Sequence, residues 1–575
     1  MGASSSVKPR VLIIGLDGAT LDLLIPWASE GKLPQMARLL KNGAWGPLQS
    51  PIPPITPPSW TSFMTGMNPG KHGVFHFIEP QPGSYGMRYV NAGHRKARTI
   101  WRILSDAGLT VGVMNIPFTY PPEAVDGFLI SGMDTPDESS DFVHPKTLRA
   151  ELERVVGKIN LDIRYLGYMS TDERRDAVLR QLAEIDEQRT RLALYLLEKH
   201  PADVMMFAYT SSDTGHHYFW QYMDPEHPFY DPVGAKKYGN AILEIYQRLD
   251  RSLGLFLDRV SDDTVVILVS DHGGGPVSDK VLYLNRFLAN LGLLTYRTGG
   301  SLGTGAWFQR SLRSLYSILR GSLSSKQKSR LAKLFPALRR RLEASSTAFN
   351  QIDWSRTQAY CNEVLMSPPN IWINLKGDKP QGIVEPDRYD SLVDRIVEQL
   401  YALKDPRTGR PLIRKVYRRN EIYQGAYVKS APDLTLCWWE KDSFVTKPSF
   451  PEDQSKPVVQ IRSEGIREGS EWSGTHTLDG VLLLRGKPIQ SGGPVKNGRM
   501  IDIAPTLLHL LGRPVPDDMD GRVLTEILDE KFLASHPVRF EKGQGGETPS
   551  GGETGYSDED AEKIEKRLQG LGYID

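Results

Sequence analysis

The sequence is poor in cysteine. Cys361 and Cys437 are the only two among its 575 residues. Two thiols so far apart cannot build a disulfide framework or a cysteine-rich metal site. They are more typical of small buried side chains in a reducing compartment, so we expect a cytoplasmic protein.

The sequence also lacks long apolar runs and an excess of charge of either sign. No stretch approaches the roughly 18 apolar residues that a membrane span requires, and no apolar segment precedes the first predicted strand. Its 70 basic and 69 acidic residues give a net charge of +1. We therefore expect no membrane span, no export signal and no stable complex with nucleic acid.

Apolar runs that alternate with helical patterns predict an α/β fold. Residues 11–16, 204–209 and 264–269 are apolar runs of the kind that form strands buried on both faces. Amphipathic segments such as residues 172–200 separate them, so the central sheet should be mostly parallel, with helices on both faces. In such sheets ligands bind beyond the carboxyl ends of the strands.

One long stretch differs from the rest in its charge. Residues 281–342 contain no Asp or Glu but carry twelve Lys and Arg, and part of the stretch has a helical apolar pattern. We expect a basic helical insertion over residues 281–349 that caps the active site, and contact with an anionic membrane or polyanion is the alternative. The flanking residues 8–280 and 350–535 should form the catalytic domain. Candidate substrate contacts in the insertion are Tyr296, Arg297 and Trp307.

The last part of the sequence has the composition of a linker followed by a short helix. We place a flexible linker at residues 536–556, because much of it is Gly, Ser, Thr and Glu. Ser557 can cap a helix within residues 557–575, with Ile564 and Leu568 on one side. We expect this helix to dock on the body or on a second subunit, which leaves a homo-oligomer open.

A hydroxyl group stands at a predicted helix start. Pro57 and Pro58 suit a first helical turn, and no helix breaker follows before Gly66. Thr56 would then meet unpaired backbone N–H groups and the positive end of the helix dipole, which favour an alkoxide and a phosphate group. An N-cap is the structural alternative for this threonine.

Carboxylates and imidazoles follow the predicted strands at one edge of the sheet. Each alone has a structural explanation, as a turn cap or a hydrogen-bonded histidine. Together they form the ligand set of zinc or manganese, and six such ligands can hold two ions about 3.5–4 Å apart. Five of the six residues follow the strands, namely Asp17, Asp213, His217, Asp271 and His272, and the sixth, His476, lies in a predicted loop that contains Gly474.

The order and spacing of these residues resemble the alkaline phosphatase superfamily, specifically the type I phosphodiesterase/nucleotide pyrophosphatase family. The resemblance spans about residues 10 to 530. Its motifs are Leu16-Asp17-Gly18, Thr56-Pro57-Pro58-Ser59 running into Thr65-Gly66, Asp213-x-x-x-His217, Ser270-Asp271-His272-Gly273 and Gly474-Thr475-His476.

This resemblance implies a role for each site residue. Asp213, His217 and His476 would hold one divalent metal, with His217 preferred to the adjacent His216 because the family spacing is Asp plus four. Asp17, Asp271 and His272 would hold the other beside Thr56. The metals would be Zn²⁺, or alternatively Mn²⁺, and Thr56 would attack phosphorus to give a phosphothreonine.

The residues around Thr56 distinguish this chain from related families. Sulfatases oxidise a Cys or Ser to formylglycine, which Thr56 cannot become, and cofactor-independent phosphoglycerate mutases, which use a Ser nucleophile, fit less well. In the phosphodiesterase family an Asn often follows the nucleophile by three residues, whereas this chain has Ser59. Ser59 and Lys71 are therefore our candidates for substrate binding.

The expected activity is hydrolysis of a phosphodiester or pyrophosphate bond in a small substrate. A phosphomonoesterase or phosphonate hydrolase with the same metals is the alternative within the enzymes. A metal-binding protein without catalysis is the alternative from another class.

Overall fold

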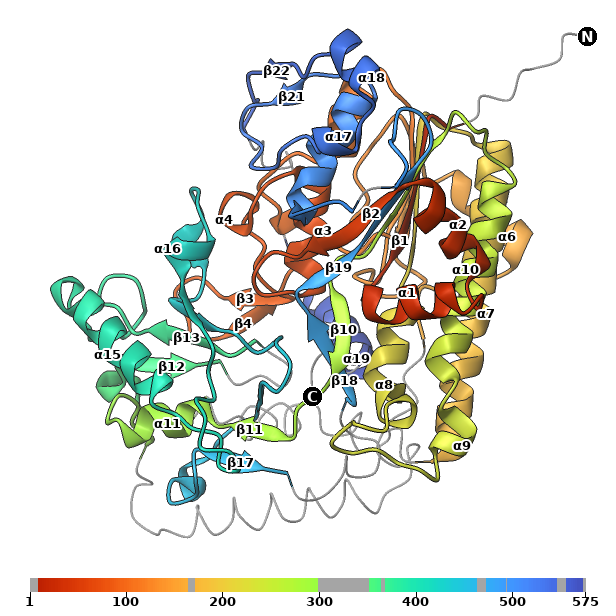
Figure 1. Cartoon of the computed structure of the whole chain (residues 1–575). Coiled ribbons are helices and arrows are strands. Elements are labelled where there is room, and N and C mark those ends of the chain that lie inside the picture. Colours follow the sequence, from red (N-terminus) through yellow and green to blue (C-terminus); the bar gives the residue numbers. More distant parts are fainter. Residues whose placement is uncertain are drawn as a thin grey trace, which may run out of the picture.

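A nine-stranded mixed sheet organises the body of the protein (Figure 1), with the strand order β20-β2-β19-β9-β1-β8-β5-β6-β7. The structure is a computed structural model that describes residues 9–163, 171–297, 351–362, 368–462, 472–492, 494–545 and 555–571. The parallel core of the sheet consists of β1 (Val11–Leu16), β8 (Val204–Tyr209), β9 (Val265–Val269), β5 (Val111–Met114) and β6 (Gly127–Ile130). The predicted α/β fold with a mostly parallel sheet is confirmed.

The remaining strands of this sheet complete its two ends. Strand β19 (Asp479–Arg485) runs antiparallel to both β9 and β2 (Ala44–Gln49), and β7 (Val143–His144) runs antiparallel to β6. Strand β20 (Gly498–Arg499) pairs in parallel with β2.

The central strand β1 lies between β8 and β9 and is buried along its whole length. Ile14 pairs with Phe207 on one side and with Leu268 on the other. Because the three strands are parallel and in register, their carboxyl ends meet at one edge of the sheet. Alternate side chains of β1 enter the two apolar clusters on the opposite faces of the sheet.

Helices cover both faces of the sheet. One face carries α1 (Leu21–Ser29), α2 (Pro34–Asn42), α7 (Asp172–Lys199), α8 (Ser211–Met223) and α10 (Ala241–Leu257). The other carries α3 (Thr56–Thr65), α5 (Ile100–Asp106) and α17 (Ile503–Leu510). Smaller elements of the body are α4 (Pro69–His72), β3 (Ile78–Pro80), β4 (Met87–Tyr89), α6 (Leu148–Val156), α9 (Ala235–Tyr238), β21 (Val515–Pro516), α18 (Glu530–Ser535) and β22 (Phe540–Glu541).

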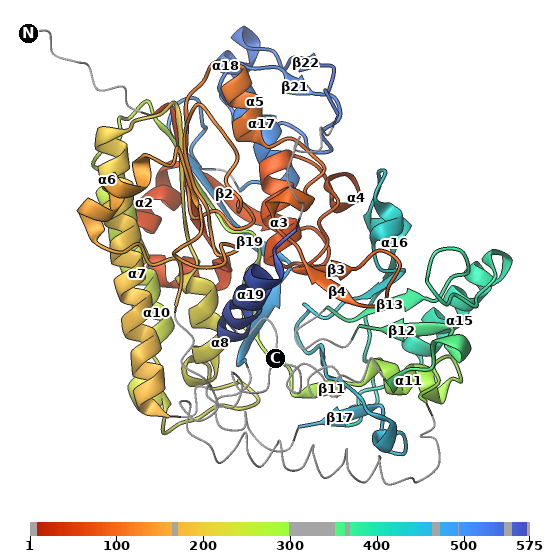
Figure 2. The ribbon, with the colours of Figure 1, turned by 180° about the vertical axis from the view of Figure 1, so that it is seen from behind.

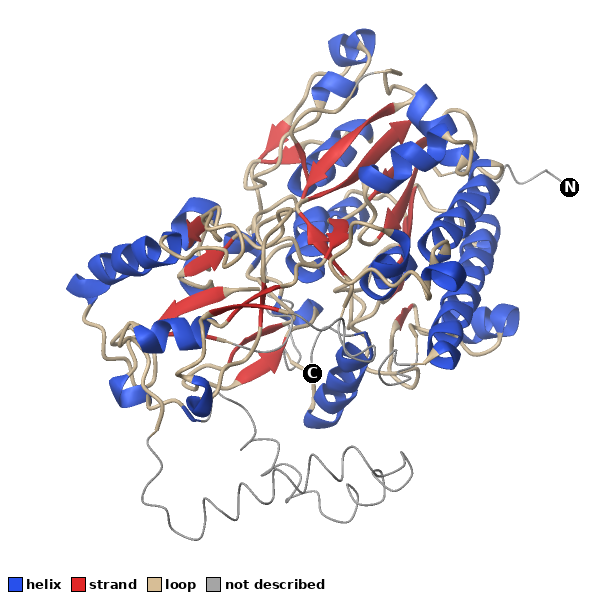
Figure 3. Cartoon of the chain, turned by 60° about the horizontal axis from the view of Figure 1, so that its bottom comes forward, coloured by secondary structure: helices blue, strands red, loops and turns tan. Residues whose placement is uncertain are grey.

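A second lobe with its own core stands beside the body (Figure 3). Its four-stranded sheet has the order β12-β13-β15-β14, and a three-stranded sheet has the order β16-β11-β17. Most of this lobe is built by residues 351–462, which the sequence predicts as part of the catalytic domain. Its elements are β11 (Lys280–Leu282), α11 (Leu284–Asn290), β12 (Ala359–Cys361), β13 (Asn370–Ile373), α15 (Tyr389–Tyr401), β14 (Val416–Arg418), α16 (Arg419–Ile422), β15 (Leu434–Leu436), β16 (Val445–Thr446) and β17 (Val459–Ile461).

The expected cap lies mostly outside the described residues. Residues 298–350, including Trp307, are not described, and the predicted boundary at residues 349 and 350 falls among them. Tyr296 is described, and its hydroxyl lies 3.3 Å from the Ser449 oxygens within the second lobe.

Two further elements lie near the carboxyl edge of the main sheet. Strands β10 (Gly273–Pro276) and β18 (Gly474–Thr477) form a two-stranded antiparallel ribbon. Helix α19 (Asp558–Leu571) packs against the body through buried Ile564 and Leu568. In the part of the chain that the structure describes, no helix combines the length and apolarity that crossing a bilayer requires.

Candidate active site

The turn after β1 brings Asp17 close to two other predicted site residues. Gly18 has a φ of +68°, and a Cβ there would lie 2.8 Å from Asp213 Oδ1, so the turn requires glycine. The Gly18 amide donates a hydrogen bond of 3.2 Å to Asp271 Oδ1. The segments that follow β1, β8 and β9 thus bring three carboxylates together, those of Asp17, Asp213 and Asp271.

Helix α8 begins almost directly after β8 and carries Asp213 and His217 one turn apart. This spacing puts both on the same helix face, with His217 Nε2 3.2 Å from Asp213 Oδ1. The neighbouring His216 points elsewhere, with its Nε2 3.2 Å from the Tyr246 hydroxyl. Of the two adjacent histidines, His217 therefore lies beside Asp213.

The β10–β18 ribbon brings in the last two histidines. Gly274 of β10 pairs with His476 of β18, and the rings of His272 and His476 stack with centroids 3.7 Å apart. His476 Nε2 lies 3.5 Å from Asp213 Oδ1, and His272 Nε2 lies 3.4 Å from Asp271 Oδ2. The six residues named in the sequence analysis thus form one group, which we call the acid–histidine cluster.

Within this cluster, two sets of atoms are placed as metal ligands would be. One set comes from Asp213, His272 and His476, the other from Asp17, Asp271 and His272, and the atoms of each set lie within 4.8 Å of one another. His217 adds its Nε2 to the first set at 3.1 Å from His476 Nε2. The two buried groups are consistent with a two-metal site.

Hydrogen bonds to the backbone fix the orientation of all three imidazoles. The Nδ1 atoms of His217, His272 and His476 lie 3.0, 3.0 and 2.9 Å from the carbonyl oxygens of Gly474, Gly273 and Pro54. A carbonyl only accepts, so each Nδ1 carries a proton, and in the neutral form of each ring Nε2 keeps a lone pair. Two lone pairs 3.1 Å apart repel each other, and a cation between them removes that repulsion.

The carboxylates of the cluster also indicate a place for a cation. Asp17 Oδ1 and Asp271 Oδ2 are buried and have no hydrogen-bond partner among the described residues. Burial, reinforced by the charges of Asp271 and Asp213, raises the pKa of Asp17 well above its usual range. Burial also raises the pKa of Asp271 to about 6. Buried negative charge that the protein leaves uncompensated is what a divalent cation stabilises.

Thr56 is the first residue of α3 and stands beside the cluster. Its side chain is fully buried, and its Oγ1 lies 3.4 Å from His272 Nε2. The N-cap of α3 is Ile55, and no side chain caps the helix. The hydroxyl of Thr56 is therefore not used as a helix cap, which was the structural alternative.

The two candidates for substrate binding make contacts within the protein. Ser59 Oγ donates a hydrogen bond of 2.6 Å to the carbonyl of Asp271. Lys71 Nζ lies 2.6 Å from Asp520 Oδ1 and 2.7 Å from the carbonyl of Asp518. Ser59 thus supports the backbone of a cluster residue, and Lys71 ties α4 to the C-terminal part of the body. Contact of either with a phosphoryl group stays a prediction.

Three side chains near the cluster were not foreseen from the sequence. The indole Nε1 of Trp60 donates to Asp17 Oδ2 at 3.1 Å, and Ser212 Oγ donates to the Asp17 carbonyl at 2.6 Å. The ring of Trp472 stacks on His217 with a centroid distance of 3.3 Å. The only sequence signal was the position of Trp60 four residues after Thr56, on the same face of a helix.

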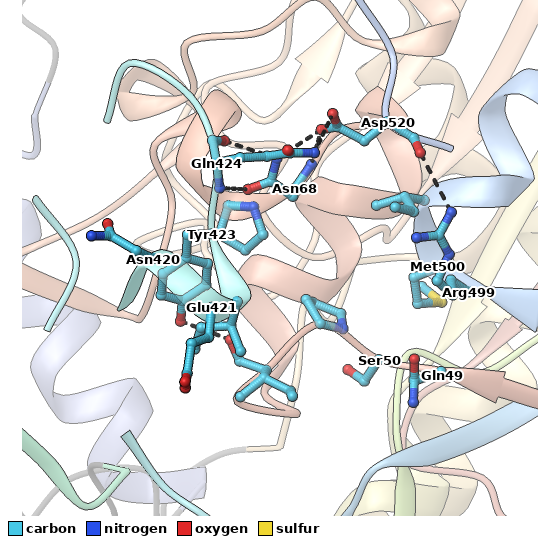
Figure 4. Close-up of a pocket in the computed structure, with 15 residues that line it drawn as sticks. Gln49, Ser50, Asn68, Asn420, Glu421, Tyr423, Gln424, Arg499, Met500 and Asp520 are labelled. Atoms are coloured by element: carbon cyan, nitrogen blue, oxygen red, sulfur yellow. Dashed lines mark hydrogen bonds between the residues drawn. The ribbon is translucent and has the colours of Figure 1, made fainter. Parts of the chain in front are cut away.

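A separate cavity of about 460 Å³ lies next to the loop that leads to Thr56 (Figure 4). Its lining includes Ser50 and Ile52 of that loop but none of the acid–histidine cluster. The polar groups around it largely satisfy one another. Asn68 Nδ2 donates to Asp520 Oδ2 at 2.8 Å, and the Tyr423 hydroxyl donates to the Ile52 carbonyl at 2.7 Å.

A solved structure shares the fold. Phosphonoacetate hydrolase from Sinorhizobium meliloti 1021, in complex with phosphonoformate, superposes with a TM-score of 0.51 at 15% identity, over 87% of this chain and 95% of that one. At this identity the similarity shows the fold alone. Murine ectonucleotide pyrophosphatase/phosphodiesterase 5, in complex with AMP, gives a TM-score of 0.48 at 13% identity, over 91% of this chain and all of that one.

The comparison with curated sequences gives a short local match. The 2,3-bisphosphoglycerate-independent phosphoglycerate mutase of Salinibacter ruber is 62% identical over 51 residues, which are 8% of this chain. The chain spans only about 10% of the length of this relative.

The decisive comparison is with a family model. The model described as type I phosphodiesterase / nucleotide pyrophosphatase matches residues 11–459. This range holds five of the six cluster residues and Thr56. The chain therefore belongs to the type I phosphodiesterase/nucleotide pyrophosphatase family of hydrolases within the alkaline phosphatase superfamily.

Proposed function

We propose that the protein is a two-metal hydrolase that cleaves a phosphodiester or pyrophosphate bond of a small substrate through a covalent Thr56 intermediate. One observation carries the proposal: a buried hydroxyl that caps no helix lies beside three carboxylates and three imidazoles whose Nε2 lone pairs face the same space. Family membership gives the reaction class.

Each half of the acid–histidine cluster would hold one cation. Asp213, His217 and His476 would bind the first, and Asp17, Asp271 and His272 the second, next to Thr56. When bound, the two cations would neutralise charge on the phosphoryl oxygens and lower the pKa of the attacking hydroxyl and of water. Zn²⁺ suits this mixture of carboxylates and imidazoles, and Mn²⁺ is the second choice.

The chain's own residues perform the bond exchange. Thr56 Oγ1 forms a bond to phosphorus as the bond from phosphorus to the leaving oxygen breaks, and the leaving group takes up a proton in place of the one Thr56 loses. Water then adds to the phosphorus of the phosphothreonine, which restores the hydroxyl and releases the second product. The net reaction consumes one water molecule.

The surroundings of Thr56 keep the reacting atoms in place. The three Nδ1–H donations to carbonyls hold the imidazole rings, and the Trp60 indole holds Asp17. Thr56, His272 and His476 are all buried and the two rings stack on each other, so packing restricts the motion of these three side chains.

The test compares Thr56 variants on three chromogenic substrates after loading with Zn²⁺ or Mn²⁺. We expect the wild-type protein to hydrolyse bis(p-nitrophenyl) phosphate faster than p-nitrophenyl phosphate or a nitrophenyl phosphonate. Thr56→Ala should lower kcat by about a thousand-fold or more, and Thr56→Ser should keep part of the activity. Thr65→Ser, which changes a hydroxyl residue at the far end of the same helix, is the matched control and should behave as wild type.

Two measurements identify the covalent step. Acid quenching during turnover of the diester should leave one nitrophenyl-phosphoryl group on the peptide that contains Thr56. A chiral phosphorothioate diester should react with retention at phosphorus, because two displacements each invert it. Inversion, or full activity of Thr56→Ala, would contradict the proposed nucleophile. A preference for the monoester or the phosphonate would support the alternative substrate class.

A further inference from the structure

The second lobe contacts the body beside the loop that leads to Thr56. Figure 1 and Figure 2 show, from opposite sides, α16 of the lobe next to α4 of the body. Just after α16, the backbone N–H of Gln424 donates to Asn68 Oδ1 at 3.1 Å, and Asn68 Nδ2 donates to the Gln424 carbonyl at 2.9 Å. The backbone N–H of Tyr427 donates to the carbonyl of Gly70, in α4, at 2.9 Å. These hydrogen bonds dock this part of the lobe on the body.

Tyr423 reaches from this docked segment to residues 50–55, which we call the Thr56 loop. Its hydroxyl donates a hydrogen bond of 2.7 Å to the Ile52 carbonyl. The Tyr423 side chain is buried, and its ring packs edge-on against Phe75 with centroids 5.1 Å apart. Burial raises the pKa of Tyr423 above its usual range, so the hydroxyl keeps its proton and remains a donor. The second lobe thus holds the Thr56 loop through a buried hydrogen bond.

The far end of the Thr56 loop contacts two parts of the candidate active site. The loop runs directly into Thr56, the first residue of α3. The Pro54 carbonyl accepts the hydrogen bond of 2.9 Å from His476 Nδ1. Between Ile52 and Thr56 stand Pro53 and Pro54, whose rings each fix one backbone torsion. Because this connection has few free torsions, a shift of the Ile52 carbonyl is passed on to Thr56 and to the carbonyl that orients His476.

The near end of the Thr56 loop borders the separate cavity of about 460 Å³ (Figure 4). Ser50, Pro51 and Ile52 line this cavity, so no close packing covers the loop on that side. Hydrogen bonds hold it instead. Ser50 Oγ donates to Ser59 Oγ at 3.1 Å, and Ser59 Oγ donates to the Asp271 carbonyl at 2.6 Å. The bond from the second lobe to Ile52 therefore restrains a part of the loop that side-chain packing leaves free.

We propose that the second lobe is part of the catalytic unit, and that Tyr423, through its hydrogen bond to the Ile52 carbonyl, sets the position of Thr56 Oγ1 and of the Pro54 carbonyl that orients His476. Tyr423 is a positioning residue, because it acts through the Thr56 loop. A lobe that is only docked on the body, without influence on the site, is the structural alternative. The proposal rests on the proposed function, which gives Thr56 the attack on phosphorus and His476 a metal ion.

The first test is Tyr423→Phe in the full-length, metal-loaded protein, a change that removes the hydroxyl and keeps the ring. Without the hydrogen bond the loop shifts, and misplacement of the attacking atom slows the bond exchange more than it weakens substrate binding. We expect kcat for bis(p-nitrophenyl) phosphate to fall by about ten-fold or more, while KM changes by less than about two-fold. Tyr427→Phe removes the hydroxyl of a half-buried tyrosine in the same segment and is the matched control. It should behave as wild type.

A second control variant separates positioning from docking of the lobe. Gln424→Ala removes the hydrogen bond of 3.1 Å from Gln424 Nε2 to Asp520 Oδ1 and leaves the bond from Tyr423 to Ile52 in place. It should leave kcat at the wild-type value at a temperature where thermal unfolding shows the protein to be folded. An equal fall of kcat in Gln424→Ala and in Tyr423→Phe would overturn the proposal, because weaker docking would then explain both.

Binding of Zn²⁺, measured by chelator competition, gives a readout that does not need turnover. When the Pro54 carbonyl is no longer held in place, His476 loses its fixed orientation. Tyr423→Phe should therefore weaken Zn²⁺ binding by Asp213, His217 and His476 by about ten-fold and leave the other half of the cluster unchanged. Wild-type kcat together with wild-type Zn²⁺ affinity in Tyr423→Phe would overturn the proposal. If wild type hydrolyses no diester, the proposed function fails, while the Zn²⁺ affinities still decide whether Tyr423 positions His476.

Discussion

Asp186 and Asp271 are both fully buried carboxylates, but only Asp186 has a cation of the protein beside it. Asp186 lies on α7, and its Oδ2 is 2.9 Å from Arg248 Nε on the neighbouring helix α10. Among the described residues, no lysine or arginine forms an ion pair with Asp271 or with Asp17. The nearest basic side chain to both acids is His272, whose Nε2 lies 3.4 Å from Asp271 Oδ2 and 3.6 Å from Asp17 Oδ1.

The difference shows which buried charges the fold compensates by itself. Burial raises the pKa of Asp186, and Arg248 opposes that rise. For Asp17, the neighbouring carboxylates add to the effect of burial. Isolated buried charge costs several kcal/mol, so the acids of such a cluster either bind protons or are balanced by a cation from outside. The contrast between Asp186 and the acid–histidine cluster therefore separates an acid that is paired within the fold from candidate metal-binding acids.

Metal removal should produce the largest effect. Stripping the protein with a chelator should lower diester hydrolysis by at least about a thousand-fold, and Zn²⁺ or Mn²⁺ should restore it. Reloading should also raise the melting temperature, since a ligand at a thousand times its Kd stabilises the folded state by about 4 kcal/mol. The chromogenic assay measures diester hydrolysis, and scanning calorimetry with and without metal measures the melting temperature. Equal activity and equal melting temperature in stripped and reloaded protein would show that the cluster needs no cation.

Replacing a carboxylate by an amide should change the free energy of unfolding differently at Asp186 and at Asp271. Asp186→Asn leaves the Arg248 charge buried without its partner and should lower the free energy of unfolding by about 3–5 kcal/mol. Asp271→Asn should leave the stability of the stripped protein unchanged or higher, because it removes one of several like charges, while metal affinity falls. Chemical denaturation of both variants without metal measures these free energies of unfolding. A large loss of stability in stripped Asp271→Asn would mean that this acid, too, is structural.

The parts of this arrangement that follow from local sequence were predictable. Buried parallel strands read as unbroken apolar runs, and residues 204–209 are predicted and observed with the same bounds. Apart from His476, which lies on β18, the acids and histidines stand directly after such strands or about one helical turn later, so their meeting at one edge follows from the geometry of a parallel sheet. The preference for His217 over His216 rests on the Asp-plus-four spacing of the resembled family, and the structure places His217 Nε2 3.2 Å from Asp213 Oδ1.

The parts that depend on long-range packing were not predictable. Residues 350–535 are predicted as part of the catalytic domain, yet strands β12, β13, β15 and β14 pair with one another in a separate lobe, because pairing partners leave no mark in a single strand. The sequence pattern predicts one helix over residues 235–260, whereas the structure has two, α9 and α10, separated by Gly239 and Asn240. The donation from Trp60 to Asp17 joins residues 43 positions apart.

Asp134 is a buried acid that is held neither by an arginine nor within the acid–histidine cluster but by backbone N–H groups. It gives a prediction about the pH dependence of stability. It accepts backbone N–H bonds from Phe118, Thr119 and Tyr120, but burial still raises its pKa to about 6. The usual value in an unfolded chain is about 3.9, so the folded state binds the proton more tightly, and stability falls as pH rises from about 4 to 6. The shift corresponds to about 3 kcal/mol.

The measurement for Asp134 is urea denaturation of metal-loaded wild type and Asp134→Asn across this pH range. The difference between their free energies of unfolding should change by about 3 kcal/mol from pH 4 to 6, with wild type losing stability relative to the variant as pH rises. Other acids contribute equally to both proteins and cancel. A pH-independent difference would mean that the three backbone donors offset the burial of this carboxylate completely.

The smallest effect concerns the Trp60 indole, an uncharged donor on α3 that holds the Asp17 carboxylate. Trp60→Phe removes the indole N–H that orients Asp17 and should weaken metal binding at that half of the site by about 10- to 100-fold. Trp101→Phe is a matched control, because Trp101 lies in the same apolar cluster and donates its N–H to Glu123, away from the site. Both variants lose ring volume, so both should lose some stability. Only Trp60→Phe should lower Zn²⁺ affinity in a chelator competition assay, and an equal loss in Trp101→Phe would assign the effect to core packing instead of the hydrogen bond to Asp17.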